Sequence, residues 1–103
     1  MEKIIKVIEE NISDSEFGVD QLCDKMFLGQ RQLYRKINAI TGLTVSEFIK
    51  EIRLKRAEQL VLMKCGTISE IAYKVGFNDP KYFSKCFKQQ FGVTPAQYSS
   101  KQV

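Results

Sequence analysis

The sequence predicts an all-α protein of about seven helices, arranged as two helix-turn-helix subdomains joined by a long linker helix. Three observations lead to this class. Apolar residues recur along the chain with the spacing of one helix face. Threonine-based capping boxes, a proline at one helix start and glycines at helix ends mark where helices begin and stop. The helix pattern of the first half recurs in the second half.

The first predicted subdomain, residues 1–43, contains three helices. Residues 2–12 form the first, residues 19–27 the second after an N-cap at Gly18, and residues 30–41 the third, which Gly42 ends. The apolar positions follow helical spacing and are expected to face a core. They are Ile4, Ile5, Ile8, Ile12, Val19, Leu22, Cys23, Met26, Leu33, Ile37 and Ile40.

The linker helix is predicted at residues 44–64. Thr44 and Glu47 form a capping box, and Leu43 and Phe48 fit the hydrophobic staple around it. About 20 residues at ~1.5 Å each give a helix of ~30 Å. Its expected apolar positions are Phe48, Ile49, Ile52, Ala57, Leu60 and Val61, and its expected outer surface carries Lys50, Arg53, Lys55 and Arg56.

The second predicted subdomain, residues 65–103, again contains three helices. A capping box at Thr67–Glu70 opens the first, which ends near Val75. Asp79 is the expected cap of the next helix, which begins at Pro80 and ends before Gly92. A box at 94–97 opens a last short helix, with fraying expected at 99–103. The expected core residues are Ile68, Ile71, Ala72, Val75, Phe83, Cys86, Phe87 and Phe91.

Residues 22–42 match residues 71–92 position by position, with one extra residue in the second turn. Leu33 corresponds to Phe83 and Ile37 to Phe87 on the inner faces. The outer faces also correspond, in the pairs Arg31 and Lys81, Tyr34 and Ser84, Arg35 and Lys85, Asn38 and Lys88. The chain is therefore expected to be a tandem of two homeodomain-like helix-turn-helix units in one domain.

Several classes of protein are excluded by composition. The chain has no histidine, no glycine-rich phosphate loop and three widely spaced cysteines, so we expect no enzyme, no metal and no cofactor. Cys23 and Cys86 fall on apolar faces and are interpreted as small core residues. No apolar run is long enough to cross a membrane and the N-terminus is too charged for a signal peptide, so a cytoplasmic location without a membrane partner is expected.

The charge is uneven. The chain carries a net charge of +4, yet residues 1–20 hold six acidic residues against two lysines, while residues 21–103 hold 14 basic residues against six acidic ones. A basic body suggests a polyanionic partner. Two groove-reading helices separated by ~30 Å would fit successive major grooves of B-DNA, ~34 Å apart, without dimerisation. The alternatives are a helical protein–protein interaction module without DNA readout, and RNA binding, for which strand-borne aromatics are lacking.

Several motifs carry a family resemblance. Residues 76–84 read GFNDPKYFS, followed by Thr94-Pro95 and Tyr98, and residues 53–57 read RLKRA. In this order they resemble the DNA-binding domain of AraC/XylS-type transcription regulators, over about residues 18–98. The linker and second unit also resemble C-terminal output domains of hybrid two-component regulators. Ser99 stands where the family often has arginine, and Cys86 where it usually has an aliphatic residue.

The resemblance implies several properties that the residues alone do not. It implies seven helices and binding to double-stranded promoter DNA in the nucleoid, usually as an activator. It also implies that the sensing or receiver module of a longer regulator is missing here. The isolated domain is expected to be monomeric, and RNA polymerase is a further candidate partner.

The candidate contacts with DNA come from the two recognition helices. Base readout is predicted for Arg31, Tyr34, Arg35, Lys81 and Lys85, and backbone contact for Gln30, Asn38, Asp79, Tyr82, Ser84 and Lys88. Arginine binds guanine with two hydrogen bonds, which lysine does less exactingly, so the first helix is expected to discriminate sequence better than the second.

Alternatives remain for several of these residues. Arg31 and Arg35 could instead contact phosphates, Tyr34 and Gln30 could touch thymine methyl groups, and Tyr82 could pack partly into the core. The basic residues of the linker, Arg53, Lys55 and Arg56, are interpreted as a solvated face, with a DNA or polymerase contact as the alternative.

Overall fold

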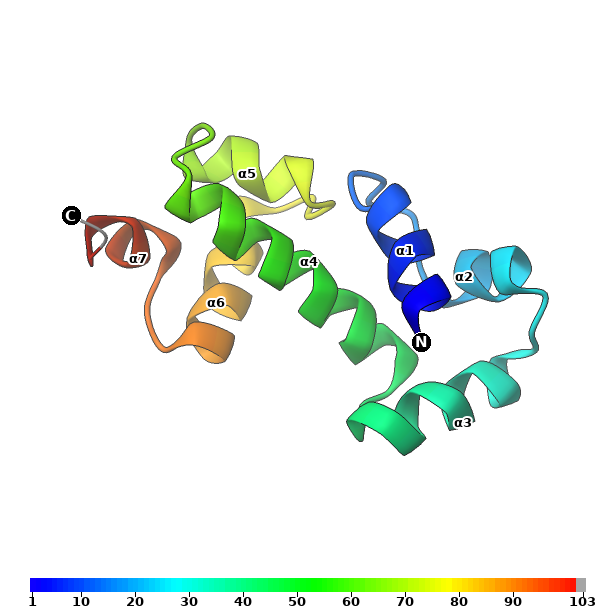
Figure 1. The fold of residues 1–103 in the computed structure, drawn as a ribbon. Helices are drawn as coiled ribbons and strands as arrows, with labels where there is room; N and C mark the ends of the chain where they lie inside the picture. The colour runs from blue at the N-terminus through cyan, green and yellow to red at the C-terminus, as the bar shows by residue number, and fades with distance from the viewer. Residues whose placement is uncertain (102–103) are drawn as a thin grey trace.

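Seven α-helices follow one another along residues 1–101, the part of the chain that the computed structural model describes, and they confirm the all-α class (Figure 1). The expected fraying at residues 102–103 lies outside the described residues, whereas residues 99–101 belong to the last helix. The helices are α1 (Glu2–Glu10), α2 (Val19–Met26), α3 (Gln30–Thr41), α4 (Val45–Leu62), α5 (Ile68–Lys74), α6 (Pro80–Phe91) and α7 (Pro95–Lys101).

The predicted helix starts are those that the structure uses, whereas α1, α2 and α4 end one or two residues earlier than predicted. At α4, Oγ1 of Thr44 accepts from the Glu47 amide at 3.2 Å, while the Thr44 amide donates to Oε1 of Glu47 at 2.9 Å. The same reciprocal pair opens α5 and α7. Gly42 and Gly92 end the two recognition helices with φ of 74° and 82°, a region that glycine enters without steric cost.

Two separate hydrophobic cores lie at the two ends of α4. The first gathers buried residues from α1, the loop before α2, α2, α3 and the start of α4, namely Ile4, Ile8, Phe17, Leu22, Cys23, Leu33, Ile37, Val45, Phe48 and Ile49. The second gathers Leu54, Ala57, Val61, Ile71, Ala72, Val75, Phe77, Phe83, Cys86 and Phe87. Since α4 serves both cores, the subdomain boundaries proposed at 43/44 and 64/65 remain a proposal. We call α1, α2 and α3 with their connecting turns the first lobe, and α5, α6 and α7 with theirs the second lobe.

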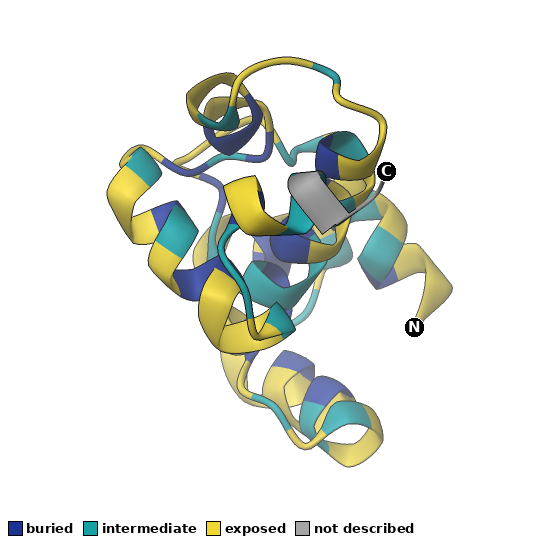
Figure 2. Ribbon diagram, turned by 90° about the vertical axis from the view of Figure 1, so that its left-hand side faces the viewer, coloured by how far each residue is buried: buried dark blue, intermediate teal, exposed yellow. Residues whose placement is uncertain are grey.

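Aromatic rings fill the second core. Phe83 meets Phe77 and Phe87 edge-on, with centroids 5.2 and 5.9 Å apart, and Phe87 also meets Tyr98 at 5.6 Å. Such tilted arrangements place the positive ring edge against the negative ring face. The first core has aliphatic residues at the corresponding positions of α3, Leu33 and Ile37, so the two units share buried apolar positions but not residue types. Figure 2 shows the buried positions on the inner sides of the helices and exposed positions outside.

Three predictions of burial are wrong. Ile40 is 65% exposed, because it borders an open groove that Met26 and Ala39 also line. α1 ends at Glu10, so Ile12 lies in the following turn, where it packs against the second core instead of extending the first stripe.

Arg53 is the third, and it is 7% exposed rather than solvated. It lies one helical turn from both Ile49 and Ala57, on the buried side of α4. The prediction took its charge as a sign of exposure. The guanidinium is buried because four main-chain carbonyls accept its hydrogen bonds. Lys55 and Arg56, by contrast, are exposed.

The molecule is elongated, with extents of 43 × 23 × 22 Å. None of the helices within residues 1–101 combines the length and the apolar character that a membrane crossing requires.

Candidate nucleic-acid interface

The first helix-turn-helix unit consists of α2, a short turn and α3. Phe27 turns the chain with φ of 56°, and the Gly29 amide donates to Oε1 of Gln32 at the start of α3. Nε2 of Gln30 donates to Oδ1 of Asp20 on α2, which holds the two helices together. Gln30 therefore already has a partner inside the unit, and its predicted contact with DNA would have to share that amide.

The outer face of α3 carries the predicted base-reading residues. Arg31 and Arg35 are exposed, and Tyr34, at 44% exposure, lies between them on the same side of the helix. Asn38 is half-buried one turn further on, where its Nδ2 donates to the Leu43 carbonyl at 3.5 Å. The first three side chains are free to meet a groove, whereas Asn38 is drawn back toward the turn after α3.

The outer face of α6 carries three lysines at helical spacing. Lys81, Lys85 and Lys88 are exposed, and Ser84 is half-buried between them. Asp79 is the N-cap of this helix, since its Oδ1 accepts from the Lys81 amide at 2.9 Å. An anionic cap repels phosphate, which disfavours the predicted contact of Asp79 with the DNA backbone, and that contact stays a prediction.

Tyr82 packs partly against the core, which was the alternative to its predicted contact with DNA. Its ring packs against Phe77 with centroids 6.1 Å apart, yet the side chain remains 50% exposed. A hydrogen bond with Cys86 raises the pKa of the Tyr82 hydroxyl, so the group is neutral at physiological pH. A neutral hydroxyl at the start of α6 is suited to donate to a phosphate oxygen.

Among the described residues, the cationic side chains of both recognition helices form no ion pair. Among the described side chains, the one ion pair joins Lys55 to Glu51 within α4, at 3.6 Å. No acidic side chain of the described residues lies close enough to the guanidinium groups of α3 or the ammonium groups of α6 to form such a pair. Binding a polyanion would therefore break no internal ion pair and would displace counterions from these groups.

Both recognition helices pack on α4, one at each of its ends, and Figure 1 shows α3 and α6 on the same side of it, with α1 and α5 on the other. α4 has 18 residues and ends at Leu62, two residues before the predicted end. At ~1.5 Å per residue it spans ~27 Å. The whole molecule spans 43 Å, which is longer than the ~34 Å between successive major grooves on one face of B-DNA.

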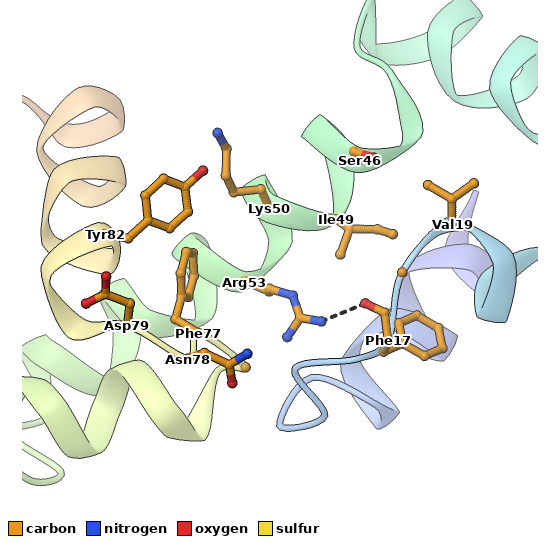
Figure 3. A pocket seen from close by; sticks show the side chains of 12 residues that line it. Phe17, Val19, Ser46, Ile49, Lys50, Arg53, Phe77, Asn78, Asp79 and Tyr82 are labelled. Atoms are coloured by element: carbon orange, nitrogen blue, oxygen red, sulfur yellow. Dashed lines mark hydrogen bonds between the residues drawn. The ribbon is translucent and has the colours of Figure 1, made fainter.

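Two basic residues of the linker helix lie elsewhere than the sequence predicted. Lys50 and Arg53 were grouped with the outer surface of the linker, but both line a cleft of about 530 Å³ between the lobes (Figure 3). Lys50 is half-buried there, and Tyr82 borders the same cleft from α6. The i, i+4 spacing of Arg53 with Ile49 and Ala57 was the available signal, whereas nothing in the sequence distinguishes Lys50 from a surface lysine.

A family model described as a helix-turn-helix domain matches residues 22–101, most of the chain. A regulator from Chromobacterium violaceum described as containing an AraC-type DNA-binding domain superposes with a TM-score of 0.89 at 26% identity, over 97% of this chain and 88% of that one. The chain belongs to the AraC-type helix-turn-helix family. Members of this family regulate transcription by binding DNA, and it is not a family of enzymes.

Two further relatives are a larger protein and a domain of a larger protein. The C-terminal domain of the two-component response regulator yesN from Fusobacterium nucleatum is 33% identical, with a TM-score of 0.84 and coverage of 95% of both chains. A protein named histidine kinase P4 from Formosa agariphila is 44% identical over 98% of this chain, which corresponds to 7% of that protein. The chain spans between 7% and 34% of the length of the first curated relatives that it matches.

Proposed function

We propose that this AraC-type domain binds promoter DNA through α3 and α6 together, with the two helices in successive major grooves on one face of the duplex. The observation that carries the proposal is that two helices with exposed, unpaired cationic faces lie on the same side of one linker helix. A single chain would then contact two half-sites about one helical turn apart, without dimerisation.

The two helices are proposed to differ in what they recognise. Arg31 and Arg35 on α3 suit bidentate hydrogen bonds to guanine, with Tyr34 against a neighbouring base. On α6, Lys81 and Lys85 reach base edges less exactingly, while Lys88, Ser84 and Tyr82 contact phosphates. Gln30 and Asn38 add backbone contacts at the edge of the first half-site. Lys50 lies between the helices and adds a phosphate contact that the sequence did not predict.

The regulatory setting is also part of the proposal. The relatives described as a histidine kinase and a two-component response regulator support an output domain at the end of a longer two-component regulator acting on the nucleoid in the cytoplasm. The regulator is proposed to activate transcription, with RNA polymerase as a second contact. The isolated domain is proposed to be a monomer.

Selection of bound duplexes from random DNA tests the function directly. We expect enriched sequences with two short motifs whose centres lie about 10–10.5 base pairs apart. Affinity for the selected duplex should fall steeply between about 50 and 200 mM salt, because several cations replace counterions on phosphates. An absence of enriched motifs together with a flat salt series would instead favour a helical protein–protein interaction module.

A further inference from the structure

The two lobes approach each other at a point beside α4. The turn after α1 reaches across to the turn after α5, so that the Ile12 carbonyl lies close to Gly76 while the Ile12 side chain packs against the second core. Elsewhere each lobe's helices pack mainly on one another and on α4. The contact between these two turns can therefore fix the angle between the lobes.

Arg53 joins the lobes at this point through four hydrogen bonds. Its Nη1 donates to the carbonyls of Ile12 and Val75, the latter at 2.8 Å. Its Nη2 donates to the carbonyls of Asp14 and Phe17 at 3.0 and 2.9 Å, and Figure 3 shows the bond to Phe17. Three acceptors belong to the first lobe and one to the second. One side chain on the linker helix therefore holds main-chain atoms of both.

The chemistry of arginine suits this position better than that of any other cation. The guanidinium is planar and directs several N–H groups in a fixed fork, which an ammonium group cannot reproduce. Burial lowers the pKa of Arg53 from its ordinary value, and the nearby Asp14 opposes that shift. The charge is held by carbonyl dipoles, without a carboxylate partner within ion-pair range among the described side chains. Removing it would leave several carbonyls without their donor.

Gly76 leaves the room that Arg53 occupies. Its φ is +89°, and a Cβ built there would lie 1.6 Å from Nη1 of Arg53 and 2.4 Å from the Ile12 carbonyl oxygen. Any side chain at this position would displace either the guanidinium or the turn of the first lobe. By contrast, Gly92 has a similar φ of +82° and open space around its Cβ position.

A cleft next to Arg53 interrupts the packing between the two lobes. It lies between the start of α2 in the first lobe and the start of α6 in the second, and its volume is about 530 Å³. The lobes are thus separated by open space on this side of the contact. Their angle depends on the stiffness of α4, on the packing of Ile12 against the second core and on the hydrogen bonds of Arg53 (Figure 3).

We propose that Arg53 is a positioning residue that fixes α3 relative to α6 and thereby sets the spacing of DNA half-sites that the domain accepts. The proposal rests on the proposed function, in which both helices contact one duplex. A rigid link between two binding elements gives high effective concentration at one spacing and little at others. Loosening Arg53 would spread that advantage over several spacings without changing either helix.

The test uses the selected duplex and versions with one or two base pairs inserted or deleted between the half-sites. For the unchanged domain we expect a loss of about tenfold per inserted pair, since one pair rotates the second half-site by about a tenth of a turn. Arg53→Met should bind the best duplex about tenfold more weakly and show a nearly flat spacing profile, with unchanged affinity for a single half-site. Arg53→Lys should lie between the two.

Matched variants separate positioning from loss of charge or of fold. Arg56→Met removes the same charge from an exposed position of α4, where Nη1 bonds to Gln59, and its spacing profile should stay sharp. Gly76→Ala should flatten the profile as Arg53→Met does, whereas Gly92→Ala should not. Circular dichroism establishes that each variant is folded.

Three outcomes are decisive. A folded Arg53→Met or Gly76→Ala domain with the unchanged spacing profile would overturn the positioning role. Unfolding of both, with Arg56→Met folded, would overturn it too, because Arg53 would then hold the fold itself. A domain of unchanged sequence that binds without preference for sequence or spacing would instead refute the proposed function.

Discussion

The hydroxyl of Tyr98 donates a 2.7 Å hydrogen bond to Oε2 of Glu58, and this bond ties the last helix to the linker helix. The bond raises the pKa of the Tyr98 hydroxyl, which stays protonated and able to donate at neutral pH. The ring of the same residue packs edge-on against Phe87. Tyr98 therefore connects α7 to α4 through its hydroxyl and to α6 through its ring.

We predict that Tyr98→Phe lowers the melting temperature while leaving the helix content unchanged. The variant keeps the ring contacts but removes the donor to Glu58. Tyr73→Phe is the matched control, because Tyr73 is exposed on α5. Thermal unfolding followed by circular dichroism measures both. Equal melting temperatures for the two variants would show that the hydrogen bond adds nothing to stability.

Arg35→Ala is predicted to weaken specific DNA binding by about 1–3 kcal/mol and to relax the preference at one base pair. Lys36→Ala removes the same charge from the next residue of α3, which lines the groove near Met26 and Ala39. Competition binding against single-base variants of the selected duplex distinguishes the two. If Arg35→Ala weakened all duplexes equally, Arg35 would contact phosphate instead of a base.

Lys88→Ala is predicted to weaken binding to all duplexes uniformly and to reduce the slope of log affinity against log salt by about 1. The reason is that an exposed lysine on α6 releases a counterion when it meets a phosphate. Lys74→Ala is the control, since Lys74 on α5 donates to the Cys65 carbonyl. A change of sequence preference in the Lys88 variant would assign Lys88 to base readout instead of phosphate contact.

Glu70→Gln is predicted to make the domain less sensitive to acid. Hydrogen bonds from Thr67 lower the pKa of the Glu70 carboxylate below its ordinary value of 4.5. Ionised Glu70 thus stabilises the folded state fully above that ordinary value, and the contribution disappears as the pH falls through the lowered value. Gln keeps an acceptor for the Thr67 amide but does not titrate.

Urea unfolding at neutral pH and at about pH 3.5 measures the effect. The loss of unfolding free energy between the two conditions should be smaller in the Glu70→Gln variant than in the unchanged domain. Glu2→Gln is a control on α1, because Glu2 has no side-chain partner in the structure. Identical acid sensitivity of the Glu70 variant and the unchanged domain would contradict the prediction.

Local sequence signals predict most of the fold, because residues close to most helix boundaries mark where the helix begins or ends. The threonine boxes, Pro80, Gly42 and Gly92 all act within four residues of the boundary that they define. Cys23 and Cys86 were placed in the cores from periodicity alone, and both are buried. Such signals depend only on neighbouring residues, so no knowledge of the tertiary arrangement is needed.

What escaped prediction depends on distant partners. Arg53 is buried because turns 22 and 36–41 residues away offer their carbonyls, which no local pattern encodes. The exposure of Ile40 and the packing of Ile12 against the second core likewise depend on the arrangement of distant segments. The exposed outer faces of α3 and α6 were predictable from the repeat, whereas the position of Lys50 in the cleft depends on how the two lobes are arranged.

The division of α4 between two cores has a consequence for how such a domain can change over time. Val45 to Ile49 belong to one core and Leu54 to Val61 to the other, so each lobe needs a helix that it shares with its neighbour. Neither lobe can be lost or exchanged alone without exposing half of that helix. Substitutions on the outer faces of α3 and α6 touch no shared part. The two halves of an operator are therefore free to diverge independently, while the body that presents the two helices is inherited as a unit.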